Sequence, residues 1–141
     1  MLEYLGYYCG GYFGPNDHLI IQKQNDSFVL DYSRFFHRYA ENGFPHFHDT
    51  WSQTRFKRWL EKLDAIEFEQ WEDKYWHQAC DGEQWELHYK YEGENTRCIS
   101  GSNAYPENWE QFKKLIMRIA RKLPRVEIMS LDEFAKLFID D

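Results

Sequence analysis

Residues 85–92 alternate strictly between large apolar and polar side chains, and no other feature of the sequence limits the fold more. The apolar positions are Trp85, Leu87, Tyr89 and Tyr91, and the polar positions between them are Glu86, His88, Lys90 and Glu92. Successive side chains of an extended chain point to opposite sides, so this pattern is typical of a strand that is buried on one face. The segment therefore predicts an antiparallel sheet whose apolar face is covered by other elements.

Two regions of the chain have the residue types of β-strands. The first 33 residues predict a three-stranded antiparallel meander, because glycines and the turn sequences at 15–17 and 25–26 divide segments rich in Tyr, Leu, Ile and Phe. The second region predicts strands over residues 68–75, 85–91 and 96–101. Residues 34–48 are expected to be irregular, because Asn42-Gly43 and Pro45 interrupt regular structure.

Two further segments have the apolar spacing of amphipathic helices. The first spans about residues 50–65 and the second 106–123; their apolar positions are Phe56, Trp59, Leu60, Leu63 and Ile66, and Trp109, Phe112, Leu115, Ile116, Ile119 and Leu123. Asp49 or Thr50 is expected to cap the first helix, and Pro106 is expected at the first position of the second. Residues 126–128 predict a short extended segment, and residues 131–138 predict a short C-terminal helix.

The order of these elements predicts a single α+β domain over residues 1–141, in which antiparallel β-meanders pack on two main helices. The halves 1–65 and 66–124 share the order βββα, and each helix begins near a Trp that precedes a Phe and two basic residues. This likeness is consistent with a tandem βββα duplication. Two unrelated amphipathic helices would produce the same pattern.

Charge and composition exclude several classes of protein. The formal net charge is −7, so the chain lacks the basic balance that is typical of nucleic-acid-binding proteins. No apolar run reaches the length of a membrane span, and the first residues lack the basic start of a secretory signal. Three cysteines without a C-x-x-C motif favour a reduced setting over a disulfide framework. We therefore expect a cytoplasmic protein that binds neither membranes nor nucleic acids.

The charge is unevenly distributed along the chain. Between Glu61 and Glu94 there are eleven acidic and three basic residues, whereas the two predicted helices are rich in Lys and Arg. An acidic surface of this kind can steer a basic protein partner to its binding site. Ordinary solvated surface, with charges that complement the helix dipoles, is the alternative interpretation.

The sequence has no motif that predicts catalysis or a cofactor. It lacks a nucleophile elbow and a phosphate-binding glycine loop, and its paired carboxylates are explained by the acidic segment. His46 and His48 form an H-x-H pair, which on an extended strand places both rings on one side, as in many metal sites. A third ligand would have to come from His37, Asp49 or Cys9, and no second ligand pair has standard spacing. The sequence therefore argues against enzyme activity and predicts no bound metal or cofactor.

Aromatic residues are abundant, with six Trp, ten Tyr and eleven Phe. Tyr and Trp offer large, rigid contact areas, so their excess favours a binding surface, although a bulky aromatic core would also account for it. The candidates for an exposed aromatic patch are Tyr4, Tyr7, Tyr8, Tyr12, Trp76 and Tyr105. The wider set of candidate binding residues is Tyr8, Tyr12, Trp71, Glu72, Asp73, Tyr75, Trp85, Asn103, Tyr105 and Asn108.

Residues 100–109, with the sequence SGSNAYPENW, form a predicted strand-to-helix junction. Gly101 permits an unusual dihedral angle or a close approach of the backbone, and Asn103 can bind free amides of the turn. The amides at the start of the following helix would suit an anion. A purely structural junction accounts for the same residues.

These residues also carry a resemblance to a known family. The segments DGEQWEL at 81–87 and GSNAYPENW at 101–109 are similar to the D-G-x-x-W-x-L strand and the G-S-N-A-Y-P-x-N-[WF] helix start of a family of small, uncharacterised bacterial proteins. Trp71 and Tyr75 match the W-x-x-x-Y that precedes those motifs in the family. The resemblance covers residues 67–123. It implies a bacterial or phage origin and a cytoplasmic domain, and it implies no catalytic residues.

Together these observations favour a non-catalytic binding module that recognises a protein partner. Immunity proteins and phage-encoded inhibitors act in this way, and the comparison with them is one of physical type. The alternative is a small-ligand or nucleotide-binding domain, with or without enzyme activity. It would use aromatic walls, the junction at 103–108 and the histidines of residues 34–48.

Overall fold

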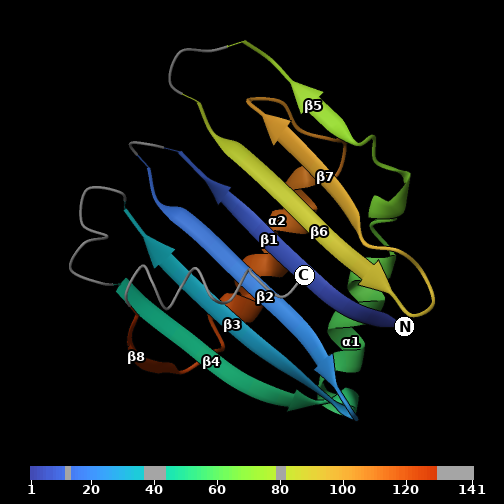
Figure 1. Ribbon diagram of the computed structural model, residues 1–141, viewed down its shortest axis with the longest axis vertical. Coiled ribbons are helices and arrows are strands. Elements are labelled where there is room, and N and C mark those ends of the chain that lie inside the picture. Colours follow the sequence, from blue (N-terminus) through green and yellow to red (C-terminus); the bar gives the residue numbers. More distant parts are fainter. Residues whose placement is uncertain (12–13, 37–43, 79–81, 130–141) are drawn as a thin grey trace.

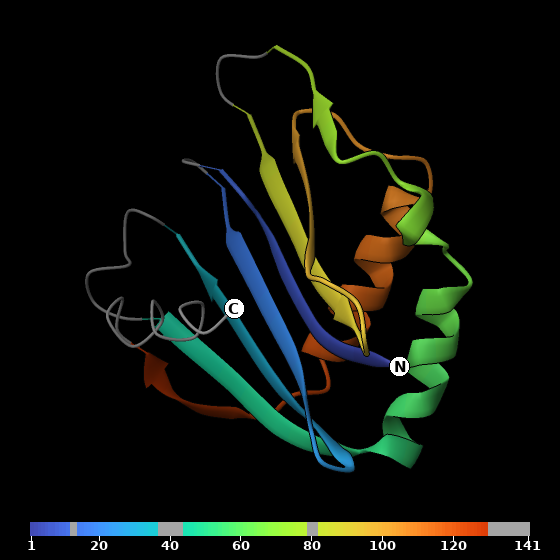
Figure 2. The same cartoon turned by 45° about the vertical axis from the view of Figure 1, so that its right-hand side comes forward.

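The computed structural model describes residues 1–11, 14–36, 44–78 and 82–129, and these residues form the α+β fold shown in Figures 1 and 2. The elements are β1 (Leu2–Gly10), β2 (Asn16–Gln24), β3 (Ser27–Phe35), β4 (Phe44–Ser52), α1 (Gln53–Asp64), the 3₁₀ helix η2 (Phe68–Gln70), β5 (Lys74–Trp76), β6 (Gln84–Tyr91), β7 (Arg97–Ser102), α2 (Trp109–Ala120) and β8 (Arg125–Met129). The described strands form one eight-stranded sheet in the order β5-β7-β6-β1-β2-β3-β4-β8. Its neighbouring strands are antiparallel except β5 and β7, which run parallel. The fold class predicted from the sequence is confirmed.

The two halves of the chain share this sheet, because β1 pairs with a strand from each half. On one side β1 pairs with β2, and the meander continues through β3 to β4. On the other side β1 pairs with β6, where Tyr7 lies opposite Leu87 and Cys9 lies opposite Trp85. The predicted alternation of residues 85–91 therefore belongs to a strand in the interior of the sheet. The origin of the two halves by duplication stays a prediction.

Helices α1 and α2 cover one face of the sheet, and we call the opposite face the outer face (Figure 2). The buried residues of α1 are Phe56, Trp59 and Leu63, and those of α2 include Phe112, Leu115, Ile116 and Ile119. The indole Nε1 of Trp59 donates to the carbonyl of Leu115 at 3.0 Å and so ties the two helices together. Trp51, Trp59, Trp71, Trp85 and Trp109 are all buried, so an aromatic core accounts for most of the tryptophans.

Residues 37–43 of the segment predicted to be irregular lie outside the described residues. The prediction is wrong for Arg34 and Phe35, which end β3, and from Phe44 onward. β4 begins there and pairs with β3, so that Ser33 lies opposite His46 and Asp31 lies opposite His48. Pro45 is tolerated because it occupies the second position of the strand, near its end. The expected cap of α1 also differs. Thr50 belongs to β4, and the N-cap is Ser52, whose Oγ accepts a hydrogen bond from the amide of Arg55 at 3.2 Å.

The predicted strand over residues 68–75 is mostly not a strand. Phe68 and Trp71 are buried while the two residues between them are exposed, and this spacing of three fits the turn of η2. Lys74–Trp76 form the short edge strand β5. Pro106 precedes α2 in a turn, since the helix begins at Trp109, whose amide donates to the Pro106 carbonyl at 3.2 Å. β8 confirms the extended segment at 126–128, and the predicted helix at 131–138 lies outside the described residues.

Candidate functional site

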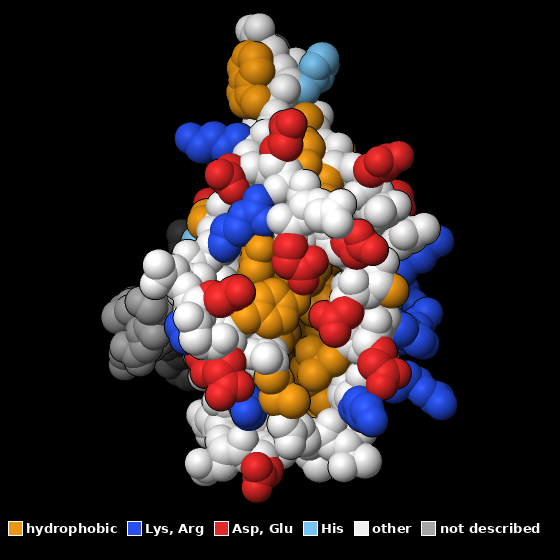
Figure 3. All heavy atoms as spheres, turned by 90° about the vertical axis from the view of Figure 1, so that its right-hand side faces the viewer, with side chains coloured by type: hydrophobic (Ala, Val, Ile, Leu, Met, Phe, Trp, Pro, Cys, Tyr) orange, Lys and Arg blue, Asp and Glu red, His pale blue; other side chains and the backbone are white. Residues whose placement is uncertain are grey.

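Six exposed carboxylates gather where the end of α1, η2 and the approach to β5 follow one another. We call this group the acidic surface; it comprises Glu61, Asp64, Glu67, Glu69, Glu72 and Asp73. Figure 3 shows acidic side chains surrounding a strip of apolar side chains on this side of the molecule. Lys62 and Lys74 are the basic residues among positions 61–76. The structure therefore brings Glu72 and Asp73, both candidates from the sequence, into a larger acidic group.

Arg97 of β7 holds the backbone beneath the acidic surface. Its guanidinium donates to the carbonyl of Glu69 at 2.6 Å and to the carbonyl of Trp71, and it also donates to the Tyr89 hydroxyl at 3.0 Å. Its Nη2 lies 3.0 Å from Oδ1 of Asp73. Most of these acceptors are neutral oxygens, so Arg97 mainly holds residues 69–73 in place. Within the acidic surface, Asp73 is the carboxylate whose charge Arg97 offsets directly. Sequence reasoning missed Arg97 because it reaches Asp73 across 24 positions of the chain.

Asp64 and Glu69 repel each other within the acidic surface. Burial raises the pKa of the Asp64 carboxyl, and the charge of Glu69 raises it further. The Tyr91 hydroxyl donates to Oε1 of Glu69 at 2.8 Å, and burial together with this bond raises the pKa of Tyr91. A cationic group placed between these carboxylates would relieve their repulsion, so the acidic surface is electrostatically suited to a basic ligand.

The structure separates the candidate aromatic residues into exposed and buried groups. Trp76, at the end of the edge strand β5, is 72% exposed, and Tyr105 is 41% exposed. The Tyr105 hydroxyl donates to Oε1 of Glu83 at 2.9 Å. Tyr7 is buried in the core, so its assignment to an exposed patch is wrong. Tyr12 lies outside the described residues.

Several candidate binding residues make internal contacts. Trp71 and Trp85 belong to the core, where the ring centroids of Trp85 and Trp109 are 4.4 Å apart. The half-buried Tyr75 accepts a hydrogen bond from the Glu72 amide at 2.9 Å, and Tyr8 donates to Oδ1 of Asn16 at 3.0 Å. These side chains support the surface without offering much contact area to a partner.

The junction at residues 100–109 holds three segments together. Asn103 has a φ of 55° and accepts a hydrogen bond from the Glu83 amide at 2.9 Å, and its Nδ2 donates to the His77 carbonyl at 3.4 Å. Nε1 of Trp85 donates to the Ala104 carbonyl at 2.9 Å. These contacts favour a structural role for Asn103 in holding the junction together over a role in ligand binding. Asn108, with a φ of 70°, is exposed beside the acidic residues Glu107 and Glu110, which disfavour an anion at the start of α2.

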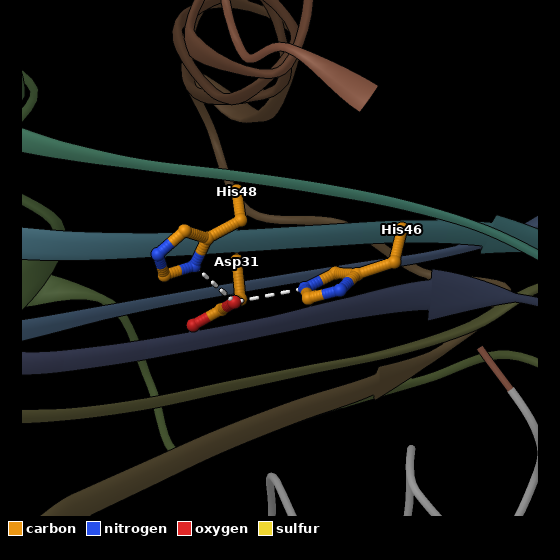
Figure 4. Close-up of side chains that lie close together, drawn as sticks. All are labelled: Asp31, His46 and His48. Carbon is orange, nitrogen blue, oxygen red and sulfur yellow. Dashed lines mark hydrogen bonds and ion pairs between the residues drawn. The ribbon is translucent and has the colours of Figure 1, made fainter. Parts of the chain in front are cut away.

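The H-x-H pair of β4 meets an aspartate of β3 on the outer face of the sheet. Nε2 of His46 and Nδ1 of His48 each lie 2.8 Å from Oδ1 of Asp31, and Figure 4 shows both rings directed at this carboxylate. One ligand atom from each of the three residues lies within 4.8 Å of the other two. His46 is 7% exposed, whereas the side chain of His48 is 39% exposed. We call these residues the His–Asp–His cluster.

Sequence reasoning named other residues as the third ligand. Asp49 belongs to the helix-covered side, where its Oδ2 accepts a hydrogen bond from Nε1 of Trp51 at 3.0 Å. Cys9 is buried in the core, and burial raises the pKa of its thiol to about 12. His37 lies outside the described residues. Asp31 is identifiable as a partner of His48 only when the register of β3 and β4 is known.

The His–Asp–His cluster and the junction are far apart. Five strand spacings separate β4 from β7, which corresponds to about 24 Å across the sheet. The structure therefore does not bring His46 and His48 together with Asn103 and Asn108 into one pocket.

Comparison with models of protein families finds no match to this sequence, and comparison with curated proteins finds no match either. The resemblance to small bacterial proteins therefore stays a prediction. Among the helices of the described residues, none has both the length and the apolar character needed to cross a membrane.

Proposed function

We propose that this protein is a non-catalytic binding module that recognises a basic protein partner through the acidic surface. The observation that carries the proposal is the grouping of six exposed carboxylates beside an edge strand that ends in an exposed tryptophan. Charges of one sign attract an oppositely charged partner over a distance and increase the rate of association. They provide orientation, and a desolvated aromatic contact then supplies much of the affinity.

Trp76 is the residue that would make this contact. It follows Glu72 and Asp73 by a few positions and lies at the edge of the sheet, where a partner can reach it from several directions. An exposed tryptophan that loses its water on binding typically contributes about 2 kcal/mol, or roughly a thirtyfold change in affinity. The support for this role is its exposure, which no other described tryptophan shares.

The experiment uses the double variant Glu67→Lys/Glu72→Lys and the single variant Trp76→Ala. Wild-type protein is immobilised and exposed to a bacterial lysate at low salt, and each retained protein is expressed and its affinity measured at low and high salt. We expect the affinity for the true partner to fall with salt. We also expect the double variant to weaken binding and slow association, and Trp76→Ala to accelerate dissociation.

The matched control is Asp26→Lys/Glu86→Lys, which changes the net charge equally but at the β2–β3 turn and on the outer face of β6. This control should retain the wild-type affinity. The proposal fails if a purified partner binds wild type, Glu67→Lys/Glu72→Lys and Trp76→Ala equally well. It also fails if the control weakens binding as much as the double variant does.

A hollow on the outer face supports the second candidate, a small-ligand site. Its volume is about 370 Å³, and Tyr4, Tyr8, His18 and His88 are among the residues around Gly6 that line it. Aromatic walls with a few polar groups are typical of sites for flat organic ligands. A thermal-shift screen of nucleotides and sugars tests this candidate, and a flat response for wild type would exclude the ligands screened.

A further inference from the structure

We propose that Asp31, His46 and His48 bind a divalent transition-metal ion of the zinc class on the outer face of the sheet. The proposal is independent of the acidic surface, because six strand spacings, or about 29 Å, separate β4 from β5.

The two strands place the three side chains together without any special loop. His46 and His48 are two positions apart on β4, so both side chains point to the same face of the sheet. Asp31 is the β3 residue directly opposite His48, and it projects from that same face between the two rings (Figure 4). The backbone pairing therefore determines the position of all three ligands.

The two distances between the imidazole nitrogens and the Asp31 carboxylate suit a first-row metal ion. Each imidazole nitrogen lies 2.8 Å from Oδ1 of Asp31. Two ligand atoms 2.8 Å apart that both bind an ion at about 2.1 Å subtend an angle of about 84° at that ion. This angle is close to the one between adjacent ligands of an octahedral ion. An ion would thus replace the two hydrogen bonds after small movements of the side chains.

Binding requires a change of tautomer in both rings. A carboxylate accepts hydrogen bonds, so without an ion each facing nitrogen must carry a proton. With an ion, each facing nitrogen presents its lone pair, and the proton is carried by the other nitrogen of the same ring. Neutral imidazoles therefore bind the ion with no net loss of protons, and the charge of Asp31 offsets part of the charge of the ion.

Packing alone does not explain His46. Its Nδ1 is buried and makes no hydrogen bond within the part of the chain that the structure describes. A buried polar atom without a partner costs free energy that an apolar side chain at this position would not. Metal-binding histidines usually donate from their second nitrogen, and loss of that bond typically weakens binding by about 10- to 100-fold. We therefore expect an ion at this site to exchange readily.

The kind of ion follows from the ligand set. Two imidazoles and one carboxylate suit Zn²⁺, Co²⁺, Ni²⁺ and Cu²⁺, whereas Ca²⁺ and Mg²⁺ prefer sites made of oxygen. Three protein ligands leave further coordination positions for water, and the exposed side of His48 allows water to reach them.

The experiment measures Zn²⁺ binding by calorimetry and Co²⁺ binding by visible absorbance, after treatment of the whole protein with a chelator. The variants are His48→Ala, which removes a partly exposed ring, and Asp31→Asn, which preserves the shape of the side chain. The control is His88→Ala, because Nε2 of His88 lies 3.6 Å from Sγ of Cys98 and 3.1 Å from Oε2 of Glu86 and could hold an ion independently. Circular dichroism establishes that each variant is folded.

We expect one Zn²⁺ per chain in wild type and in His88→Ala. We expect about tenfold or greater loss of affinity in His48→Ala and in Asp31→Asn. Zn²⁺ should raise the melting temperature of wild type and His88→Ala but not of the other two variants. The proposal is overturned if folded wild type does not bind Zn²⁺. It is also overturned if His88→Ala abolishes Zn²⁺ binding while folded His48→Ala or Asp31→Asn retains it.

Discussion

Replacement of Gly101 by alanine tests how tightly the aromatic core is packed. A Cβ added at Gly101 would lie 2.7 Å from Cζ2 of Trp85 and closer still to Nε1 and Cε2 of the same ring. Carbon atoms in ordinary contact are about 3.5–4.0 Å apart, so the indole would have to move by about 1 Å or more. It has little room to do so, since its ring centroid lies 4.4 Å from that of Trp109 and 6.2 Å from that of Trp71.

The magnitude of the effect follows from two losses. Overpacking a dense core typically costs about 1–3 kcal/mol. Movement of the indole also breaks the bond from its Nε1 to the Ala104 carbonyl, and a buried polar group left without a partner costs about 1–3 kcal/mol. We therefore expect Gly101→Ala to lower the free energy of unfolding by about 3–5 kcal/mol. With an m-value of about 2 kcal/mol/M, the urea midpoint should fall by about 2 M.

The measurement is urea unfolding followed by far-UV circular dichroism, with two companion variants. Gly14→Ala is the matched control, because among the described residues, apart from the chain neighbours of Gly14, no atom lies within 4 Å of its added Cβ; it should change stability by less than about 0.5 kcal/mol. Trp85→Leu removes the ring atoms that clash, so Gly101→Ala should cost at least about 1 kcal/mol less in that background. A cost below about 1 kcal/mol in wild type, or strict additivity with Trp85→Leu, would refute the packing argument.

Three further predictions concern the charged and thiol groups. Arg97→Ala should destabilise the protein by about 2–3 kcal/mol, because two backbone carbonyls lose their hydrogen-bond donor. Asp73→Asn should cost less than about 1 kcal/mol, since that carboxylate is exposed. Equal urea midpoints for the two variants would contradict this expectation. Burial and the charges of Glu86 and Asp73 raise the pKa of Cys98, so in a Cys80→Ala background iodoacetamide should react slowly at pH 8, and Glu86→Gln should accelerate the reaction. Burial raises the folded-state pKa of Asp64 above the unfolded value of 3.8, so the destabilisation caused by its ionisation grows between pH 3.8 and the folded-state pKa and is constant above it. Asp64→Asn should therefore increase stability at pH 7 but not at pH 3, and a decrease at pH 7 would show that the carboxylate is stabilising.

Local patterns predicted the elements whose residues interact with near neighbours in sequence. The alternation that begins at Trp85 and the apolar stripe that begins at Trp109 each show directly which face of the element is buried. The strand β6 and the helix α2 form there as expected. β4 was missed because Pro45 reads as a breaker unless its place near the end of a strand is known. The strand predicted at 68–75 was wrong because Phe68 and Trp71 are buried at a spacing of three.

The candidate sites depended more on tertiary structure. The sequence identified His46 and His48 but not Asp31, because their meeting depends on the register between β3 and β4. Arg97 escaped notice for the same reason, since nothing near it in sequence indicates the carbonyls that it binds. Trp76 was among the aromatic residues expected to be exposed. Composition could not distinguish it from Tyr7, which is buried in the core.

The place of β1 in the middle of the sheet has a consequence for how the chain folds. One edge of β1 cannot pair until residues 84–91 have been synthesised, so that edge stays unpaired while the intervening residues are made. Pairing over such a long separation gives a high contact order, and we expect folding in milliseconds to seconds instead of microseconds. The seam between β1 and β6 would also allow a chain cleaved between α1 and η2 to reassemble from its two fragments. Each fragment would contribute one side of that seam.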